Sequence, residues 1–356
     1  MSRKLNPHTR VAHLRRGRGW SQSELAEKAG VSRAGISAIE MGRLVPSVAA
    51  ALRVASALGE SVESVFGDAP LPVLRWAWAP AGTSDGRAWQ ATVGRQVLTF
   101  GTEPTAAGTI PHDGWTDGRR WVQRSNASLP DRTLVVAGCD PLVGLLAREM
   151  ATTHQIRVLP LLRSSTAALA LLRQGLVHVA GIHYSDSASR SANDRVVRGT
   201  LGPGYRLMHQ LRWDTGIALT GHRPERSAAA LLRANVRWVN REEGSSARRT
   251  FDVLLGSRRR PSGYECVVRD HRAVAATVSS GWAEAGVCIR PTATEARLGF
   301  IPVQQEAYEL CVSESLSDDP RVRALLATLQ SPGYRQLLDD VPGCKAARTG
   351  DVRPVA

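Results

Sequence analysis

The feature that most constrains this fold is a repeated alternation of strand and helix patterns between Thr133 and Leu255. A short apolar run, TLVVA, precedes a turn-forming GCDP segment, and helical periodicity follows from Leu142 to Met150. The order recurs, with strands expected at 156–162, 177–182, 205–219 and 236–240 and helices at 164–173, 227–234 and 247–255. Such alternation predicts an open parallel sheet with helices on both faces, in two series, whose ligands gather at the carboxyl ends of the strands.

The length of the chain predicts more than one domain, because 356 residues exceed one ordinary core of about 100–200 residues. The sequence is 43% apolar, and no apolar run approaches the roughly 18–20 residues that a bilayer requires. The first 20 residues lack the apolar segment and cleavage site of a secretory signal. We therefore expect a cytoplasmic globular protein that makes no membrane contact.

The net charge of +14 is the excess of 46 basic over 32 acidic residues, and all but three of the basic residues are arginine. Such an excess of arginine over lysine more often reflects the base composition of the genome than a function. Charge alone therefore does not locate a DNA-binding surface. Five cysteines stand at wide spacings without a C-x-x-C pair, at positions 139, 266, 288, 311 and 344. This pattern argues against a disulfide framework or a structural zinc site, so we expect reduced thiols, no metal and no cofactor.

The amino-terminal residues predict a series of short helices, at 7–17, 21–30, 32–42, 47–58 and 61–66. Asn6 followed by Pro7 is a helix start, and Ser21 and Glu24 have the spacing of a capping box. Leu52 is expected on the apolar face of the fourth helix. The second and third helices are joined by a short glycine turn, which is the layout of a helix-turn-helix.

The run RGWSQSELAEKAGVSRAGISAIEMGRLVPSVAAALRVASALGESVESVF resembles the Cro/repressor (Xre-type) helix-turn-helix family over nearly its whole length. The resemblance implies an all-α domain over residues 1–68 that binds double-stranded DNA. It implies that Gln22 contacts phosphate and that the start of the third helix faces the major groove through Ser32, Arg33, Ala34, Ser37 and Ala38.

Arg33 is the best candidate for reading a base, because an arginine fork matches guanine O6 and N7. Arg43, in the loop after the third helix, should contact phosphate. The run of Arg15, Arg16 and Arg18 either contacts phosphate or is a solvated face.

Residues 69–129 are expected to connect this domain to a second one at 130–345, which leaves a tail at 346–356. The segments RWAWAPAG and ATVGRQVLTFG favour two strands, and the Gly/Asp/Trp-rich stretch at 101–121 favours a loop. The tryptophans here are interpreted as packing residues.

Several strand-to-helix loops begin with small hydroxyl residues, notably Ser164-Ser165 and Gly244-Ser245-Ser246, alongside Gly138-Cys139-Asp140. Backbone N–H groups at such helix starts form a cradle for an anion, and serine adds donors without bulk. Serine is also a good helix cap, so a single loop of this kind is not decisive. The prediction of an anion site depends on several such loops converging.

A second resemblance covers roughly residues 130–345. The segments LVVAGCDPLVGLLA, LLRSSTAALALLRQGLVHVAGIHY, VNREEGSSARRTFDVLL, GYECVVRDHRAVAATVSSGWAEAGV and LGFIPVQQEAYELCVS are similar to the periplasmic-binding-protein-like domain related to molybdate-binding proteins. The resemblance implies an α/β domain of two lobes that close over a small ligand. By position, it implies ligand contacts from Cys139, Ser164, Ser165, Ser245, Ser246, His271 and Tyr308.

Charged residues near these loops leave alternatives open. Arg241, Arg248 and Arg249 flank the Gly-Ser-Ser loop and can neutralise an anion, although Arg249 can equally be solvated. His271 is either a ligand contact or an ordinary helix-start histidine. An ionised Asp140 repels a dianion, so either it faces away as a helix cap or the ligand carries a donor.

These features together favour a one-component transcription regulator, a homodimer whose sensor domain binds a small anion such as molybdate, tungstate or a molybdopterin-like species. The alternative is a protein that handles molybdenum cofactor or its precursor, with the helix-turn-helix serving a partner contact. Neither a nucleophile elbow nor an H-x-x-x-H motif stands out, so we expect no enzyme activity.

Overall fold

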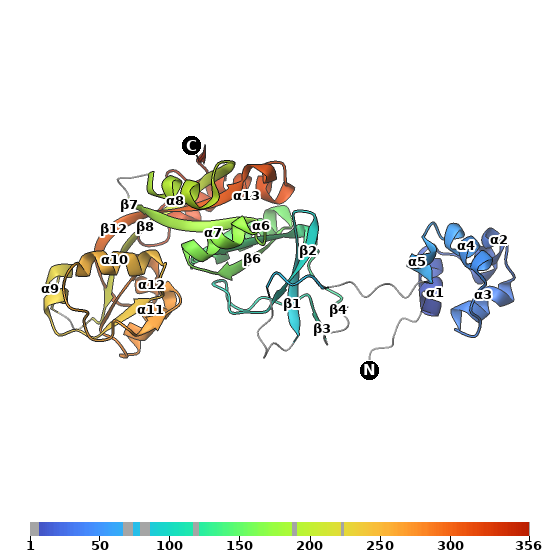
Figure 1. Cartoon of the computed structure of the whole chain (residues 1–356), viewed down its shortest axis with the longest axis horizontal. Helices are drawn as coiled ribbons and strands as arrows, with labels where there is room; N and C mark the ends of the chain where they lie inside the picture. Colours follow the sequence, from blue (N-terminus) through green and yellow to red (C-terminus); the bar gives the residue numbers. More distant parts are fainter. Residues whose placement is uncertain are drawn as a thin grey trace. The chain divides into compact units, whose positions relative to one another are not determined.

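The computed structural model describes residues 7–66, 74–78, 86–116, 121–186, 191–221 and 224–355. The chain divides into two compact units, one of residues 1–74 with 116–122 and the other of residues 75–115 with 123–356. Figure 1 shows the elements of each unit in sequence colours. Asn6, the end of the expected RWAWAPAG strand at 79–82 and part of the expected loop at 117–120 lie outside the described residues.

The first unit is built from α1 (Pro7–Gly17), α2 (Gln22–Ala29), α3 (Arg33–Glu40), α4 (Val48–Ala57) and α5 (Val62–Val65). The capping box at Ser21 and Glu24 is formed in both directions, and Gly30 ends α2 with a φ of 60° that favours glycine. The helices share one core that includes Val11, Leu25, Ile36, Ile39, Val54 and Leu58. The expected all-α helix-turn-helix fold is confirmed.

Leu52 was expected in this core, and that prediction is wrong. Its side chain is 54% exposed, whereas Ala51, Val54, Ala55 and Leu58 are buried. The buried stripe of α4 follows the 3.6-residue period through those four positions, which turns Leu52 toward solvent.

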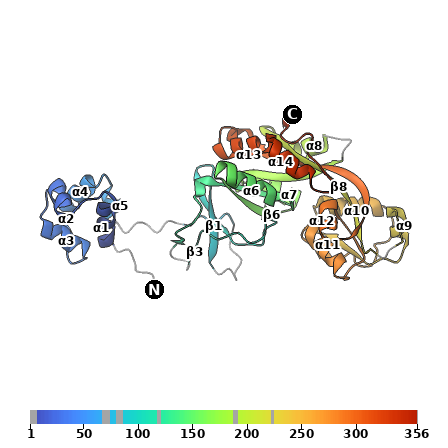
Figure 2. The ribbon, with the colours of Figure 1, turned by 180° about the vertical axis from the view of Figure 1, so that it is seen from behind.

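The first lobe of the second unit has three parallel strands, β5 (Thr133–Gly138), β6 (Arg157–Leu162) and β7 (Val179–Asp186). Leu134 and Val136 of β5 pack toward one face, while Val135 and Ala137 pack toward the other. The first face is covered by α6 (Val143–His154), α13 (Pro320–Gln330) and α14 (Pro332–Asp339), which lie together in Figure 2. The second is covered by α7 (Ser165–Arg173) and α8 (Ser191–Leu201).

The sequence did not predict α8. Its segment, SANDRVVRGTL, is mostly polar, and Val197 is its fully buried apolar side chain. So polar a segment is typical of a surface loop as well as of an exposed helix, so its composition does not mark the helix.

The second lobe repeats the arrangement with parallel strands β9 (Trp238–Arg241), β10 (Val267–Val268) and β11 (Ala285–Ile289). On one face α9 (Ala228–Arg233) and α10 (Ser246–Leu255) pack over Trp238 and Val287. On the other face α11 (His271–Ser279) and α12 (Arg290–Glu295) pack over Val239 and Cys288.

Two 15-residue strands, β8 (Tyr205–Leu219) and β12 (Gly299–Ser313), pair antiparallel and run through both lobes (Figure 1). The strand order is β10-β9-β11-β8-β12-β7-β5-β6. The two predicted series are parallel within themselves, but the sheet as a whole is mixed, because this antiparallel pair joins them. The two-lobed α/β fold itself is confirmed.

A hairpin precedes the first lobe, formed by β1 (Arg87–Val93) and β2 (Gln96–Gly101) around a turn at Gly94 with a φ of 61°. The segment ATVGRQVLTFG was expected as one strand, but this turn divides it. Short strands β3 (Gly114–Thr116) and β4 (Trp121–Gln123) follow. Trp89 and Phe100 share a core with Leu159 of β6, so much of the expected connecting segment belongs to the sensor.

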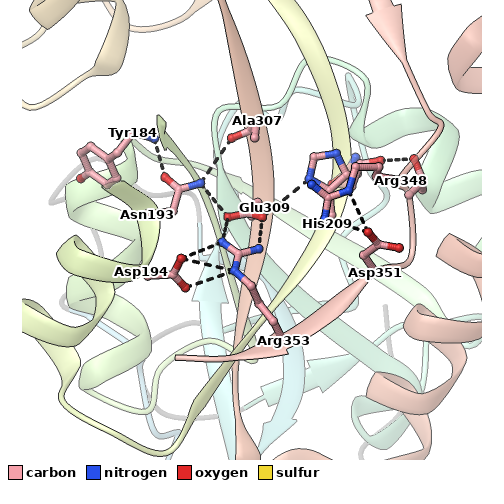
Figure 3. A network of polar contacts seen from close by, with 11 residues as sticks. Tyr184, Asn193, Asp194, His209, Ala307, Glu309, Arg348, Asp351 and Arg353 are labelled. Atoms are coloured by element: carbon pink, nitrogen blue, oxygen red, sulfur yellow. Dashed lines mark hydrogen bonds and ion pairs between the residues drawn. The ribbon is translucent and has the colours of Figure 1, made fainter. Parts of the chain in front are cut away.

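The expected tail is also part of the fold. Strands β13 (Cys344–Lys345) and β14 (Val352–Pro354) pair with β8. Arg353 of β14 donates to both Glu309 and Asp194, and Glu309 also accepts from Asn193 at 2.8 Å (Figure 3). This network fixes β14 to β12 and α8.

Short 3-10 turns lie at η1 (Pro130–Arg132) and η2 (Glu314–Leu316). Among the described helices, none combines the length and the apolar character that crossing a membrane requires. The five cysteines carry free thiols, and Cys266 is the exposed one.

Candidate functional site

The first candidate surface is the start of α3. The side chains of Ser32, Arg33 and Ala34 are exposed, and Ser37 is half-buried. The Ser32 hydroxyl accepts from the Gly35 N–H at 3.0 Å, so it caps α3. Arg33 therefore lies on an open helix face, where a major groove can be reached.

Gln22 and Arg43 border this surface. Arg43 is exposed in the loop after α3. Gln22 donates to a Glu40 carboxylate oxygen at 2.8 Å, and Arg15 donates to both oxygens of the same group. Arg15 is thus engaged inside the domain, which favours a structural role for it over a phosphate contact.

The second candidate site lies between the two lobes and centres on a chain of three buried side chains. Cys139, in the loop after β5, places its Sγ 3.0 Å from His183 Nε2 on β7. The other ring nitrogen of His183, Nδ1, lies 2.7 Å from the Glu306 carboxylate on β12. A thiol, an imidazole and a carboxylate in this order suit either nucleophile activation or metal ligation.

The remaining contacts of Glu306 come from α10 of the second lobe and from the two long strands. The Ser246 hydroxyl at the start of α10 donates to it at 2.7 Å, and the Gln304 amide donates at 2.8 Å. Trp213 of β8 donates to its other oxygen at 3.4 Å, so the carboxylate is saturated with donors. Glu306 thereby joins β7 of one lobe to α10 of the other.

Two more contacts join the loops that were expected to converge. Thr166 at the start of α7 donates to the Gly244 carbonyl at 3.3 Å. Arg249 of α10 lies over the ring of Tyr184, 4.4 Å from its centroid. The two serine-bearing helix starts therefore meet across the cleft, although Arg249 is engaged with an aromatic ring rather than directed at an anion.

The serine hydroxyls of these helix starts have different partners. Ser164 accepts from Ala167 N–H at 3.4 Å, and Ser245 accepts from Arg248 N–H at 3.2 Å while it donates to the Glu242 carbonyl. These two serines are helix caps. Ser165 instead accepts from the His183 N–H at 3.3 Å, which places it beside the central chain.

Arg241 and His271 are buried at the cleft without matching partners. Arg241 is 1% exposed, and its Nε and Nη1 have no hydrogen-bond partner among the described residues. Its Nη2 donates to Glu242 at 3.1 Å. Both ring nitrogens of His271 also lack a partner within the described part of the chain.

Burial and neighbouring groups shift the pKa values of the buried side chains in the cleft in different directions. Burial alone lowers the pKa of His183, but Cys139 and the Glu306 carboxylate raise it to about 10. Burial and the nearby charge of Arg241 hold the pKa of His271 well below its ordinary value. The pKa of Glu306 is lowered despite burial, because His183, Ser246 and Gln304 stabilise its charge.

Asp140 faces the start of α6, but it is not the helix cap of the first alternative, because Leu142 is the N-cap residue and α6 has no side-chain cap. One oxygen accepts from the Leu142 N–H at 2.7 Å and the other from Gln210 at 2.8 Å. Burial raises its pKa to about 6. Its two donors direct it away from the cleft.

Tyr308 lies behind the central chain, where its ring centroid is 5.8 Å from that of His183. A Cβ added to Gly181 would lie 1.8 Å from the Tyr308 hydroxyl oxygen, and one added to Gly138 would lie 2.3 Å from it. Glycine at both positions makes room for this hydroxyl between β5 and β7.

A cavity of about 240 Å³ opens beside the site. Its walls come from Cys139 and Leu162 of the first lobe, from Asp270, His271 and Arg272 of the second, and from the loop at 104–108. Arg272 donates to the Ala106 carbonyl at 2.9 Å, which holds this loop against the second lobe. Sequence reasoning treated the loop as part of a linker, and no local signal placed it at the cleft.

Sequence reasoning also missed the roles of His183, Glu306, Gln304 and Trp213. His183 was not among the expected ligand contacts, and the other three belong to strands that no loop signal marks. Alternation along β12 places Gln304 and Glu306 on one face, but only tertiary pairing turns that face into the cleft.

The folds and sites define a DNA-binding-type helix-turn-helix domain fused to a two-lobed ligand-binding domain. Residues 147–330, just over half of the chain, match the profile of the PBP superfamily domain, and residues 11–65 match a helix-turn-helix profile of the Xre type. The chain therefore belongs to the PBP superfamily and carries an Xre-type helix-turn-helix. Its relation to molybdate binding stays a prediction.

Individual relatives match different parts of the chain. The uncharacterized protein YvgK of Bacillus subtilis (strain 168) is 27% identical over 226 residues, 62% of this chain and 73% of its own length. An uncharacterized HTH-type transcriptional regulator of Methanothermobacter thermautotrophicus is 46% identical over 59 residues, 16% of this chain and 86% of its own. PhnD1 of Prochlorococcus marinus, solved with methylphosphonate, is 15% identical over 61% of this chain and 93% of its own, with a TM-score of 0.43.

Proposed function

We propose that this protein is a cytoplasmic, homodimeric transcription regulator whose sensor domain binds a small anion between its lobes. The observation that carries the proposal is the buried guanidinium of Arg241, with two of its three nitrogens lacking partners among the described residues. Burying a cation without sufficient partners is costly, so a bound anion would stabilise the closed domain.

The surroundings of Arg241 fit that role. It ends β9 at the carboxyl edge of the parallel series, next to the starts of α10 and α11. Backbone donors and the positive helix ends favour an anion there, and the unpartnered Nε and Nη1 of Arg241 each offer an N–H group to an oxyanion. The partly exposed Glu242 supplies only one contact to Nη2.

Closure of the lobes supplies the coupling to DNA. The closed state is held by bonds from Glu306 and Thr166 across the cleft. An anion that binds only this state shifts the population toward it, which changes how the DNA-binding domains of a dimer are presented. The small helix-turn-helix domain covers only a half-site, so a dimer doubles the contacts.

Thermal unfolding of the full chain with molybdate, tungstate, phosphate and a pterin tests the proposal. An anion at 100 times its Kd should raise the free energy of unfolding by about 2.7 kcal/mol. Arg241→Met should lose about 1.5–3 kcal/mol of anion binding, because it removes hydrogen bonds from a charged donor. Arg259→Met, which changes an exposed arginine of the same lobe, is the matched control.

Arg241→Lys, which keeps the charge and loses the fork, should bind the anion with intermediate affinity. Fluorescence anisotropy with promoter DNA then shows whether the anion changes DNA affinity. Equal anion affinity in the wild type and a folded Arg241→Met variant would contradict the proposal.

A further inference from the structure

Three potential metal ligands converge in the cleft from separate segments of the chain. Cys139 Sγ, a His183 ring nitrogen and a His271 ring nitrogen all lie within 4.8 Å of one another, and all three residues are buried. Cys139 and His183 belong to the first lobe, whereas His271 begins α11 of the second. The sequence analysis predicted no metal because the chain has no local metal-binding motif. Such motifs do not detect donors this far apart in sequence.

We propose that Cys139, His183 and His271 bind a zinc ion between the lobes. Zinc prefers thiolate and imidazole donors at about 2.3 and 2.0 Å in a tetrahedral arrangement, which separates neighbouring donors by about 3.3–3.5 Å. The Sγ to Nε2 distance of 3.0 Å and the 4.8 Å limit for the group bracket these separations. Small side-chain movements therefore bring the three donors to zinc distances.

The surroundings of His183 are those of a metal ligand. Its Nδ1 faces the Glu306 carboxylate at 2.7 Å, so the ring donates there, and Nε2, which faces Cys139, is the nitrogen that would lose its proton to bind the metal. Metal-bound histidines are usually oriented by such a carboxylate contact. Glu306 is in turn held by Ser246 and Gln304, so its position is fixed.

His271 supplies the independent observation. Its ring is 1% exposed, yet neither nitrogen finds a hydrogen-bond partner among the described residues. Buried polar groups are normally satisfied, and an unpaired buried histidine beside a thiol and a second histidine calls for a ligand. Nucleophile activation of Cys139 by His183 and Glu306 would leave His271 without a role.

Three protein ligands leave a fourth zinc position open. Cys139 and His271 also line the 240 Å³ cavity, so water can complete the tetrahedron from there. If the proposed function is right, the anion attracted by Arg241 can take this position instead, and that step alone depends on it. Because the donors come from both lobes, zinc occupancy favours the closed state.

Cobalt titration of the full-length reduced protein tests the site. One Co²⁺ per chain should bind with the near-ultraviolet thiolate-to-cobalt charge-transfer band and the intense visible bands of tetrahedral coordination, and Zn²⁺ should displace it. Cys139→Ser should remove the charge-transfer band. His271→Gln should weaken Co²⁺ affinity while keeping that band. Glu306→Gln should also weaken Co²⁺ affinity, about 10–100-fold, because His183 is then no longer held in place.

The control variants are Cys266→Ser, which changes an exposed thiol, and His154→Gln on α6. Both should keep the wild-type spectrum, and circular dichroism checks folding of every variant. The zinc site is overturned if the wild type gives no thiolate band, or if the band survives in Cys139→Ser. Alkylation of Cys139 at the same rate with and without Zn²⁺ would overturn it too, and would favour a reactive thiol.

Failure of this site is distinguishable from failure of the anion proposal. Arg241→Met should keep the cobalt spectrum while losing the anion response. A normal anion response without a cobalt spectrum overturns the zinc site alone. A normal cobalt spectrum in a protein that binds no anion supports the zinc site and contradicts the proposed function alone.

Discussion

The DNA-binding domain and the sensor domain use polar side chains in opposite ways. The candidate DNA-contacting residues of α3 lie within six positions of one another and are mostly exposed. The sensor instead buries its polar residues, which include Asp140, His183, Arg241, His271, Glu306 and Glu309. The buried groups come from segments far apart in the sequence, and His183 and Glu306, which contact each other, are 123 positions apart.

This difference teaches where each domain is vulnerable. An exposed reader can be lost with little effect on folding, because water takes over its hydrogen bonds. A buried charge depends on its partner, and removing the partner leaves an uncompensated ion. We therefore expect sensor variants to affect stability first and variants of the α3 surface to affect recognition first.

The largest effect is expected at Arg353. Arg353→Met leaves Glu309, which is 2% exposed, without its cationic partner, and it also frees Asp194. Breaking a buried pair in this way costs about 3–5 kcal/mol. Chemical denaturation followed by tryptophan fluorescence should show the loss in the unfolding transition of the sensor domain. A loss below 1 kcal/mol would show that the network of Figure 3 is dispensable.

Acid should reproduce much of that loss. Burial raises the pKa of Glu309, but Arg353, His209 and Asn193 together lower it from the ordinary 4.5 to about 2. A depressed pKa gives stability that is present above pH 4.5 and is lost as the pH falls toward 2, here about 3 kcal/mol. Denaturation midpoints across this window should fall less steeply in Glu309→Gln than in the wild type. Parallel pH profiles would contradict the assignment.

Local signals explain how much could be predicted. Ser21 with Glu24, Ser32 and Gly30 specify helix ends through contacts three or four residues away, and the helices formed where expected. The β5, β6 and β8 strands likewise followed their apolar runs. Elements governed by their own neighbours can be read from sequence.

The cleft could be predicted only in part, because its contacts are not local. The Gly-Ser-Ser and Ser-Ser loops do meet, yet the hydroxyls of Ser164 and Ser245 cap their own helices. Glu306 acquires its place through antiparallel pairing of β12 with β8, which an alternation of strands and helices does not indicate. The prediction of two parallel series omitted the antiparallel pair for the same reason.

Arg33 should show the opposite behaviour to Arg353. Because Arg33 is exposed, Arg33→Ala should leave the denaturation curve unchanged within about 0.5 kcal/mol. It should instead lose about 1–3 kcal/mol of discrimination between specific and random DNA, as expected for a bidentate base contact. Gln22→Ala should weaken binding to all duplexes, although its bond to Glu40 adds a small stability cost. Anisotropy titrations at fixed salt measure both, and equal losses on specific and random DNA for Arg33→Ala would remove its base-reading role.

The smallest effect is expected for the serines that cap helices, a feature that both domains share. Ser21 caps α2 in the DNA-binding domain and Ser245 caps α10 in the sensor, each by accepting from the backbone N–H three residues on. Replacing either with alanine should cost about 1 kcal/mol of stability, since a cap acts through its own helix turn whatever the rest of the domain buries.

Ser245→Ala should leave anion affinity nearly unchanged because its hydroxyl is occupied by the cap and the Glu242 carbonyl, whereas Ser246→Ala should weaken anion affinity by releasing Glu306. Calorimetric titration of the two serine variants, with denaturation of each, measures both quantities. A larger loss of anion affinity in Ser245→Ala than in Ser246→Ala would mean that the cap hydroxyl turns to the ligand when the site is filled.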